Sequence, residues 1–194
     1  AGGGATGRSR LALEEAELLG VVEAAVLLVE DDVDEVVSAA EEALASLASL
    51  VEEPERGGLL MPHLSELAGS EEEEIRMSAA KLYGMVGPSL PAADCLYACS
   101  ELLDLSADAQ FRVRKAAALA LPPLIAAAGP EAAREALLPA FGRLAQDSNW
   151  AVRRGCAEAF AACARALPPD LRASEELAEL FESLANDVSQ AVRG

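Results

Sequence analysis

A motif that recurs about every 39 residues is the feature that most constrains the fold of this chain. In three places an Asp lies five residues before a Val-Arg pair, and these Asp residues are separated by 39 and then 40 positions. Weaker copies precede them, since Ile75-Arg76 lies 38 residues before Val113, and Val36-Val37 lies 39 residues before Ile75. Such a period indicates stacked copies of one supersecondary unit. The full copies are Asp108 with Val113-Arg114, Asp147 with Val152-Arg153, and Asp187 with Val192-Arg193.

Apolar and small residues keep the same register around each motif. Large apolar residues three and six positions before the Asp predict a helix that ends near it. Small residues three and four positions after the Val predict a second helix that a neighbour can approach closely. Gly87-Pro88, Gly129-Pro130 and Pro168-Pro169 follow the second helices and separate the units, whereas Pro122-Pro123 should kink or end one of them early. The apolar pairs are Leu64 and Leu67, Leu102 and Leu105, Phe141 and Leu144, and Phe181 and Leu184.

The composition supports the same fold class. Hydrophobic residues make up 52% of the chain, mostly as Ala and Leu, and aromatic residues only 4%, which disfavours a β-rich fold. The sequence therefore predicts an all-α solenoid of about nine helices, in antiparallel pairs that form a right-handed superhelical stack. We expect residues 1–10 to be a disordered tail and residues 11–194 to hold about four to five repeats, truncated at the C-terminal end without capping repeats.

The charge is large and unevenly distributed. The net charge is −18, and residues 1–107 carry 22 acidic and 5 basic side chains, against 11 and 10 in residues 108–194. A chain this acidic should not bind nucleic acid. Glu71 to Glu74 fit either a helix start, where the dipole favours carboxylates, or an acidic ridge that attracts basic partners. The apolar stretch 116–128 is too short to span a membrane, and no signal peptide is evident. We therefore expect a soluble protein, cytoplasmic or nuclear, with no membrane partner.

The sequence offers no constellation for catalysis or for a metal. His63 is the one histidine, and the cysteines are Cys95, Cys99, Cys156 and Cys163, at helical spacing inside Ala-rich stretches. Buried thiols in a reducing compartment explain them better than zinc, which would need further ligands. There is no phosphate-binding loop and no Gly-x-Ser-x-Gly motif. We expect no enzymatic activity, no cofactor and no metal.

The segment from Leu137-Leu138-Pro139 through Asp147-Ser-Asn-Trp150-Ala-Val152-Arg153 to Phe160 resembles the HEAT repeats of Ser/Thr protein phosphatase regulatory subunits, including those of protein phosphatase 4. The scaffold subunit of protein phosphatase 2A has similar turns. The resemblance is good over residues 98–194 and weaker over 11–97, where Val37 stands in place of the Arg. It implies a non-catalytic solenoid that holds a metal-dependent phosphatase catalytic subunit and helps choose its substrates. An importin-like adaptor whose acidic half binds basic segments is the alternative.

Two sets of residues are candidates for function. We expect each motif Asp to cap the second helix and each motif Arg to reach an Asp of an adjacent repeat, which gives a ladder of charge-assisted hydrogen bonds. Direct contact of these residues with a partner is the alternative. Phe111, Trp150 and Gln190 share the position two before the Val, where a turn should project, and Trp is a frequent binding hot spot. The resemblance implies that this ridge of turns grips the catalytic subunit. The ladder is Asp108, Arg114, Asp147, Arg153, Asp187 and Arg193, and the partner-binding set is Gln110, Phe111, Arg112, Asn149, Trp150 and Gln190.

Overall fold

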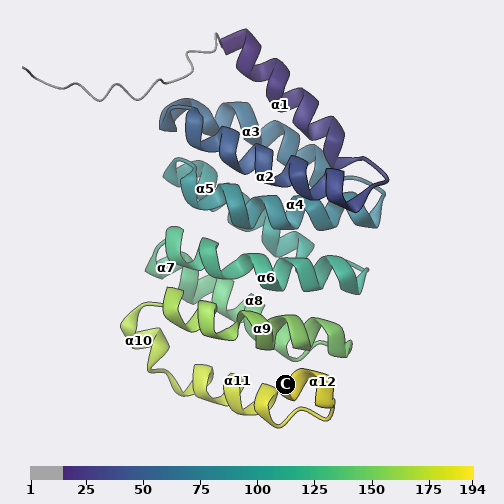
Figure 1. The fold of residues 1–194 in the computed structure, drawn as a ribbon. Helices are drawn as coiled ribbons and strands as arrows, with labels where there is room; N and C mark the ends of the chain where they lie inside the picture. Colours follow the sequence, from purple (N-terminus) through teal and green to yellow (C-terminus); the bar gives the residue numbers. More distant parts are fainter. Residues whose placement is uncertain (1–14) are drawn as a thin grey trace, which may run out of the picture.

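The computed structural model describes residues 15–194, and in that range the chain is a stack of antiparallel helix pairs without a strand (Figure 1). The predicted tail at residues 1–10 lies outside the described residues. The first helices of the pairs form one layer, which we call the A row, and the second helices form the B row. The A row is α1 (Glu15–Val29), α3 (Glu53–Ala68), α5 (Ala92–Leu105), the run α7 (Pro130–Ala132), η2 (Ala133–Leu137) and α8 (Leu138–Ala145), and α11 (Glu175–Ala185). The B row is α2 (Asp34–Leu50), α4 (Glu73–Val86), α6 (Phe111–Ala127), α9 (Trp150–Ala166) and α12 (Gln190–Arg193).

Small residues set the close approach of neighbouring B helices. The contacts of α4 with α6 and of α6 with α9 bury Ala79, Ala80, Ala116 and Ala117. At Gly84 an added Cβ would lie 2.9 Å from the Cβ of Ala120 and 3.0 Å from its Cα, so only glycine fits this crossing. The predicted run of small residues after each motif Val is thus the surface on which the B helices stack.

Large apolar side chains from both rows fill the space between the layers. The predicted pairs on α3, α5 and α8 are all buried, with Phe141 completely inaccessible. Phe181 departs from the prediction, because its side chain is 56% exposed. The inward stripe of α11 is Leu177, Leu180 and Leu184, and Phe181 lies one position around the helix, where it contacts Phe160 with a ring separation of 5.4 Å.

Proline and glycine mark most of the unit boundaries as predicted. Gly87-Pro88 forms the short helix η1 (Gly87–Ser89), Gly129-Pro130 opens α7, and Pro168-Pro169 opens the short helix α10 (Pro169–Arg172). The expectation that Pro122-Pro123 would end α6 early is wrong, since the helix continues to Ala127. The turn around these prolines is buried against the core, and packing there offsets the two missing backbone hydrogen bonds.

Candidate functional site

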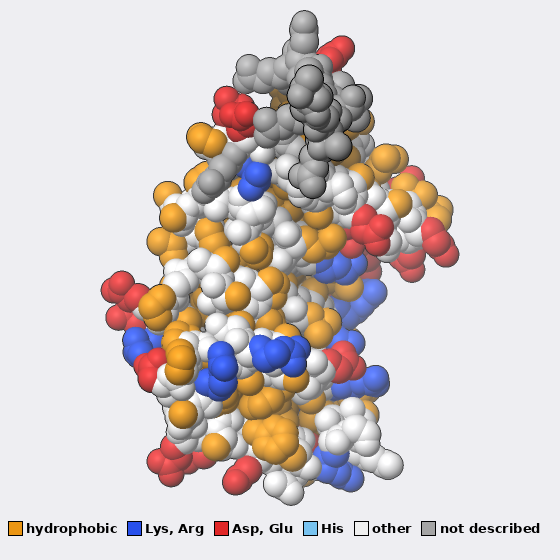
Figure 2. Space-filling view, turned by 60° about the vertical axis from the view of Figure 1, so that its left-hand side comes forward, with side chains coloured by type: hydrophobic (Ala, Val, Ile, Leu, Met, Phe, Trp, Pro, Cys, Tyr) orange, Lys and Arg blue, Asp and Glu red, His pale blue; other side chains and the backbone are white. Residues whose placement is uncertain are grey.

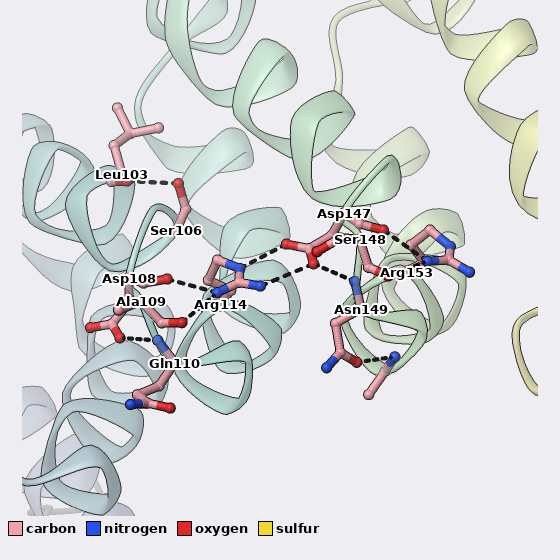
Figure 3. Close-up of polar contacts among 11 residues, drawn as sticks. Leu103, Ser106, Asp108, Ala109, Gln110, Arg114, Asp147, Ser148, Asn149 and Arg153 are labelled. Carbon is pink, nitrogen blue, oxygen red and sulfur yellow. Dashed lines mark hydrogen bonds and ion pairs between the residues drawn. The ribbon is translucent and has the colours of Figure 1, made fainter.

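A ladder of bidentate Arg–Asp pairs joins consecutive repeats along the edge of the solenoid where the B helices begin (Figure 3). Arg114 donates from Nε to Asp147 Oδ2 at 2.7 Å and from Nη2 to Oδ1 at 3.0 Å. Arg153 binds Asp187 in the same way, at 2.6 and 3.0 Å. Each Arg therefore belongs to one repeat and its Asp to the next, so every pair spans a joint of the solenoid.

Each Arg also fixes the turn of its own repeat. The Nη1 atom of Arg114 donates to the carbonyls of Asp108 and Ala109, at 2.8 and 3.0 Å, and Arg153 does the same to the carbonyls of Asp147 and Ser148 (Figure 3). One guanidinium thus holds its own turn and the neighbouring turn together. This use of four donors in a planar fork explains why Arg rather than Lys occupies the position.

The role expected of the Asp as helix cap needs correction. Asp147 Oδ1 accepts a hydrogen bond from the backbone N–H of Asn149 at 2.8 Å, and Asp108 does so from Gln110 at 2.7 Å. Asn149 and Gln110 are themselves the N-cap residues of α9 and α6, so the Asp lies two positions earlier and closes the turn that leads into the helix. The side chain that caps α9 is Asn149, which accepts from the N–H of Ala151 at 2.9 Å.

Partial burial and the Arg partner shift the pKa of the ladder carboxylates in opposite directions. Burial raises the pKa of Asp147, but the hydrogen bonds from Arg114 and from the Asn149 N–H outweigh it, so the net pKa is lowered. The pKa of Asp108 is lowered by the same balance. In Asp187 the hydrogen bond from Arg153 is the largest influence and lowers the pKa. The ladder is therefore ionised at neutral pH.

The ladder reaches further toward the N-terminus than the predicted set and then stops. Arg76 binds Asp108 at 2.7 and 3.1 Å, a pair that its register with Val113-Arg114 could have identified. At the joint before it, Val37 stands where the Arg would be and Ser70 where the Asp would be. Both partners are replaced together. Beyond the last joint, Arg193 donates to the carbonyl of Asp187 at 2.5 Å.

A different ion pair holds the joint that lacks the Arg–Asp pair. Lys81 on α4 contacts both carboxylate oxygens of Glu41 on α2, at 3.0 and 3.2 Å. The Glu41 side chain is only 7% exposed, whereas that of Lys81 is 44% exposed. This pair lies further along the B helices than the ladder.

The predicted partner-binding residues lie together at the starts of the B helices. Trp150 and Phe111 are the first residues of α9 and α6, and their side chains are 48% and 38% exposed. Gln190 begins α12 in the same register and is exposed. Arg112 is held across the joint by Glu74 at 2.7 Å and by Glu73 at 3.7 Å. Gln110 and Asn149 precede the helices as N-caps.

Two hollows on the B row were not identified from the sequence. The larger has a volume of about 670 Å³, lies over α4 and α6, and is lined mainly by apolar side chains with three cations. The smaller, of about 280 Å³, lies at the joint without an Arg–Asp pair and is largely acidic. Met77, Lys81 and Arg112 line both. The acidic hollow contains Glu30, Asp31, Asp32, Asp34, Glu72 and Glu74.

The cysteines and acidic residues form no metal site within residues 15–194. All four thiols are free and buried, and burial raises the pKa of Cys163 to about 12. His63 on α3 is half-buried. Of the helices described, none is long and apolar enough to cross a bilayer.

Comparison with known proteins agrees with this geometry. Residues 137–167, which include α8 and α9, match the HEAT repeat family. An engineered protein solved by the Northeast Structural Genomics Consortium is 24% identical with a TM-score of 0.52, over 90% of this chain and 75% of that one. The fold is an α-solenoid that contains a HEAT repeat at residues 137–167. A designed armadillo repeat protein in complex with the peptide (KR)4 is also similar, with 21% identity and a TM-score of 0.52, over 92% of this chain and 82% of that one. No curated protein matches the chain significantly.

Proposed function

We propose that this solenoid is a non-catalytic scaffold that binds the catalytic subunit of a Ser/Thr protein phosphatase and directs its substrate choice. The observation that carries the proposal is the half-exposed Trp150 at the first position of α9, in register with Phe111 on α6. Exposure of aligned aromatic side chains to water is energetically unfavourable, and Trp is among the most frequent binding hot spots.

The turn that carries Trp150 is held rigidly before any partner arrives. Asn149 caps the helix, and Arg153 binds the carbonyls of Asp147 and Ser148. A preorganised turn loses little conformational entropy on association, which favours affinity. At Phe111, Arg114 holds the turn in the same way, but the N-cap residue Gln110 makes no side-chain cap.

The class of partner rests on the sequence resemblance. The segment from Leu137 to Phe160 is similar to a repeat of regulatory subunit 1 of protein phosphatase 4, and the scaffold subunit of protein phosphatase 2A has comparable Asp-x-x-Trp-x-Val-Arg turns. In those scaffolds the turns grip the catalytic subunit. HEAT and armadillo solenoids are typically scaffolds, which supports a non-catalytic role for this chain.

Trp150→Ala tests the proposal. We expect the substitution to weaken capture of purified phosphatase catalytic subunit by at least about 2 kcal/mol, the hot-spot range, while the midpoint of thermal unfolding changes little. Tyr97→Ala is the matched control, because Tyr97 is 49% exposed on α5, away from the turns. A large loss of stability with unchanged affinity per folded molecule would show that Trp150 serves the fold and not the partner.

An adaptor that binds basic segments is the second candidate, and the acidic hollow favours it. Six carboxylates line that hollow, at the joint where the Arg of the ladder is replaced by Val37. The solved designed armadillo protein is in complex with a (KR)4 peptide. Salt-sensitive binding of (KR)4 to this chain, lost in Asp32→Asn and kept in Asp104→Asn, would favour this function over the first.

A further inference from the structure

The larger hollow on the B row is an apolar groove with an unusual floor. Gly84, Ala116 and Ala120 form its base, because only small residues fit where α4 and α6 cross. Larger side chains stand around this base without covering it. Met85 and Leu119 are 42% and 44% exposed, and Phe111 closes one end. Nothing in the chain from residue 15 onward fills the groove, although apolar surface of this kind is normally buried.

The rim of the groove carries three cations, although the protein is strongly acidic overall. Lys81, Arg112 and Lys115 line it, and no acidic side chain does. Glu41 pairs with Lys81, and Glu73 and Glu74 pair with Arg112, whereas Lys115 has no hydrogen bond or ion pair within residues 15–194. Figure 2 shows this polarity along one edge of the stack, where acidic side chains at the N-terminal end give way to a column of basic ones.

We propose that this groove is a docking site for a short amphipathic segment of another protein, with apolar side chains on one face and Asp or Glu on its flanks. The apolar side chains would contact Met85, Leu119 and Phe111, and an acidic flank would pair with Lys115, the rim cation without a partner among the described residues. Electrostatic complementarity of this kind gives specificity and a faster association rate.

The groove also sets the length of the segment. Its lining on α6 runs from Phe111 to Pro123, a separation of twelve residues, which is about 18 Å at 1.5 Å per residue. A helix of about twelve residues, or an extended segment of about five, spans that distance. A basic segment would be repelled by the unpaired Lys115, and residues 1–14 of this chain carry Arg8 and Arg10. An acidic segment of another protein therefore fits the groove better than a basic segment or residues 1–14 of this chain.

The groove shares Phe111 and Arg112 with the turn ridge proposed above, but Trp150, on which that proposal rests, does not line it. A test at Trp150 and a test at the groove can therefore fail independently. The probe is a synthetic peptide of about twelve residues with Leu and Phe at helical spacing flanked by Glu, labelled with a fluorophore. Its counterpart carries Lys in place of every Glu. Binding of both peptides to the full chain is measured by fluorescence anisotropy at two salt concentrations, on wild type and on the variants below.

We expect the acidic peptide to bind at least tenfold more tightly than the basic one, and less tightly at high salt. Lys115→Met keeps the aliphatic stem that covers Gly155 and removes the charge, and it should weaken binding about three- to tenfold. Leu119→Glu should weaken it more. The controls are Arg143→Met on α8 and Leu96→Glu on α5, which alter exposed residues of the A row. Thermal melts establish that each variant is folded.

Three results would overturn the proposal. One is equal or tighter binding of the basic peptide, which would assign the groove to cationic segments. Another is unchanged affinity in both Lys115→Met and Leu119→Glu. The last is concentration-dependent self-association of the full chain that Leu119→Glu abolishes, which would identify a second copy as the occupant. Trp150→Ala should leave peptide binding unchanged, so loss of the turn ridge and loss of the groove are distinguishable.

Discussion

Removing Arg114 tests how much an Arg–Asp pair contributes to holding two repeats together. Arg114→Ala deletes four hydrogen bonds at once, two to Asp147 and two to the carbonyls of its own turn. The carbonyls can turn to water, but the Asp147 side chain is only 10% exposed and keeps one partner, the N–H of Asn149. Most of the cost therefore comes from a carboxylate left partly desolvated.

The expected magnitude follows from this burial. Breaking a fully buried ion pair by removing one partner costs about 3–5 kcal/mol, whereas exposed pairs contribute about 0–1 kcal/mol. Arg114 and Asp147 are 17% and 10% exposed, nearer the buried limit, so we expect a loss of about 2–4 kcal/mol. The equivalent change at Arg153, Arg153→Ala, should cost about 1–3 kcal/mol, because it strands the Asp187 carboxylate, which is 7% exposed.

Urea unfolding followed by circular dichroism measures the effect, and Arg112→Ala is a control on the same helix. Arg112 is 47% exposed and pairs with Glu74, which is 68% exposed, so its removal should change stability by about 0.5 kcal/mol or less. Arg114→Lys should recover only part of the loss, since an ammonium cannot reproduce the planar fork. Equal shifts in the midpoints of Arg114→Ala and Arg112→Ala would refute the argument that the ladder clamps the joints.

Two further predictions concern the B-row crossing and the pH dependence of the ladder. Gly84→Ala should lower the free energy of unfolding by about 1–3 kcal/mol, because the new Cβ would meet Ala120. Gly58→Ala on α3 has open space around the new Cβ and should raise the free energy of unfolding by about 0.4–1 kcal/mol. Denaturant melts of both variants measure the two changes. Because the pKa of Asp147 is lowered by folding, its contribution is complete above the unfolded value of about 3.9 and is lost as pH falls through the folded value. The stability difference between wild type and Asp147→Asn should therefore be constant from pH 7 to about 5 and shrink below about pH 4; a difference that persists undiminished at pH 2 would contradict it.

The sequence was sufficient for the fold because its repeat is regular at the positions that pack. Val113 and Val152 are fully buried, and the small residues after them form the B-row crossings. Phe181 shows the limit of the spacing argument. Phe181 occupies the same repeat position as Phe141, but the buried face of α11 is formed by Leu177, Leu180 and Leu184.

The two hollows on the B row could not be predicted from the sequence, because their residues come from different repeats. Met85, Leu119 and Lys115 have no common motif, and their meeting depends on the small residues that bring α4 and α6 together. The spacing of residues within one helix likewise does not predict an ion pair across a joint, such as that of Glu41 and Lys81, which are forty positions apart. The Arg76 pair is the exception, because the repeat register alone would have placed it.

The ladder and the exposed aromatic residues share a structural cause. Arg114 holds the turn before Phe111, and its other hydrogen bonds hold Asp147, whose carboxylate closes the turn that leads to Asn149 and Trp150. The pair that stabilises the joint therefore also fixes the two aromatic side chains relative to each other. The packing of α6 against α9 supports the same spacing. The regularity of the Asp–Arg motif thus serves the stack and, in our proposal, the ridge that binds the partner.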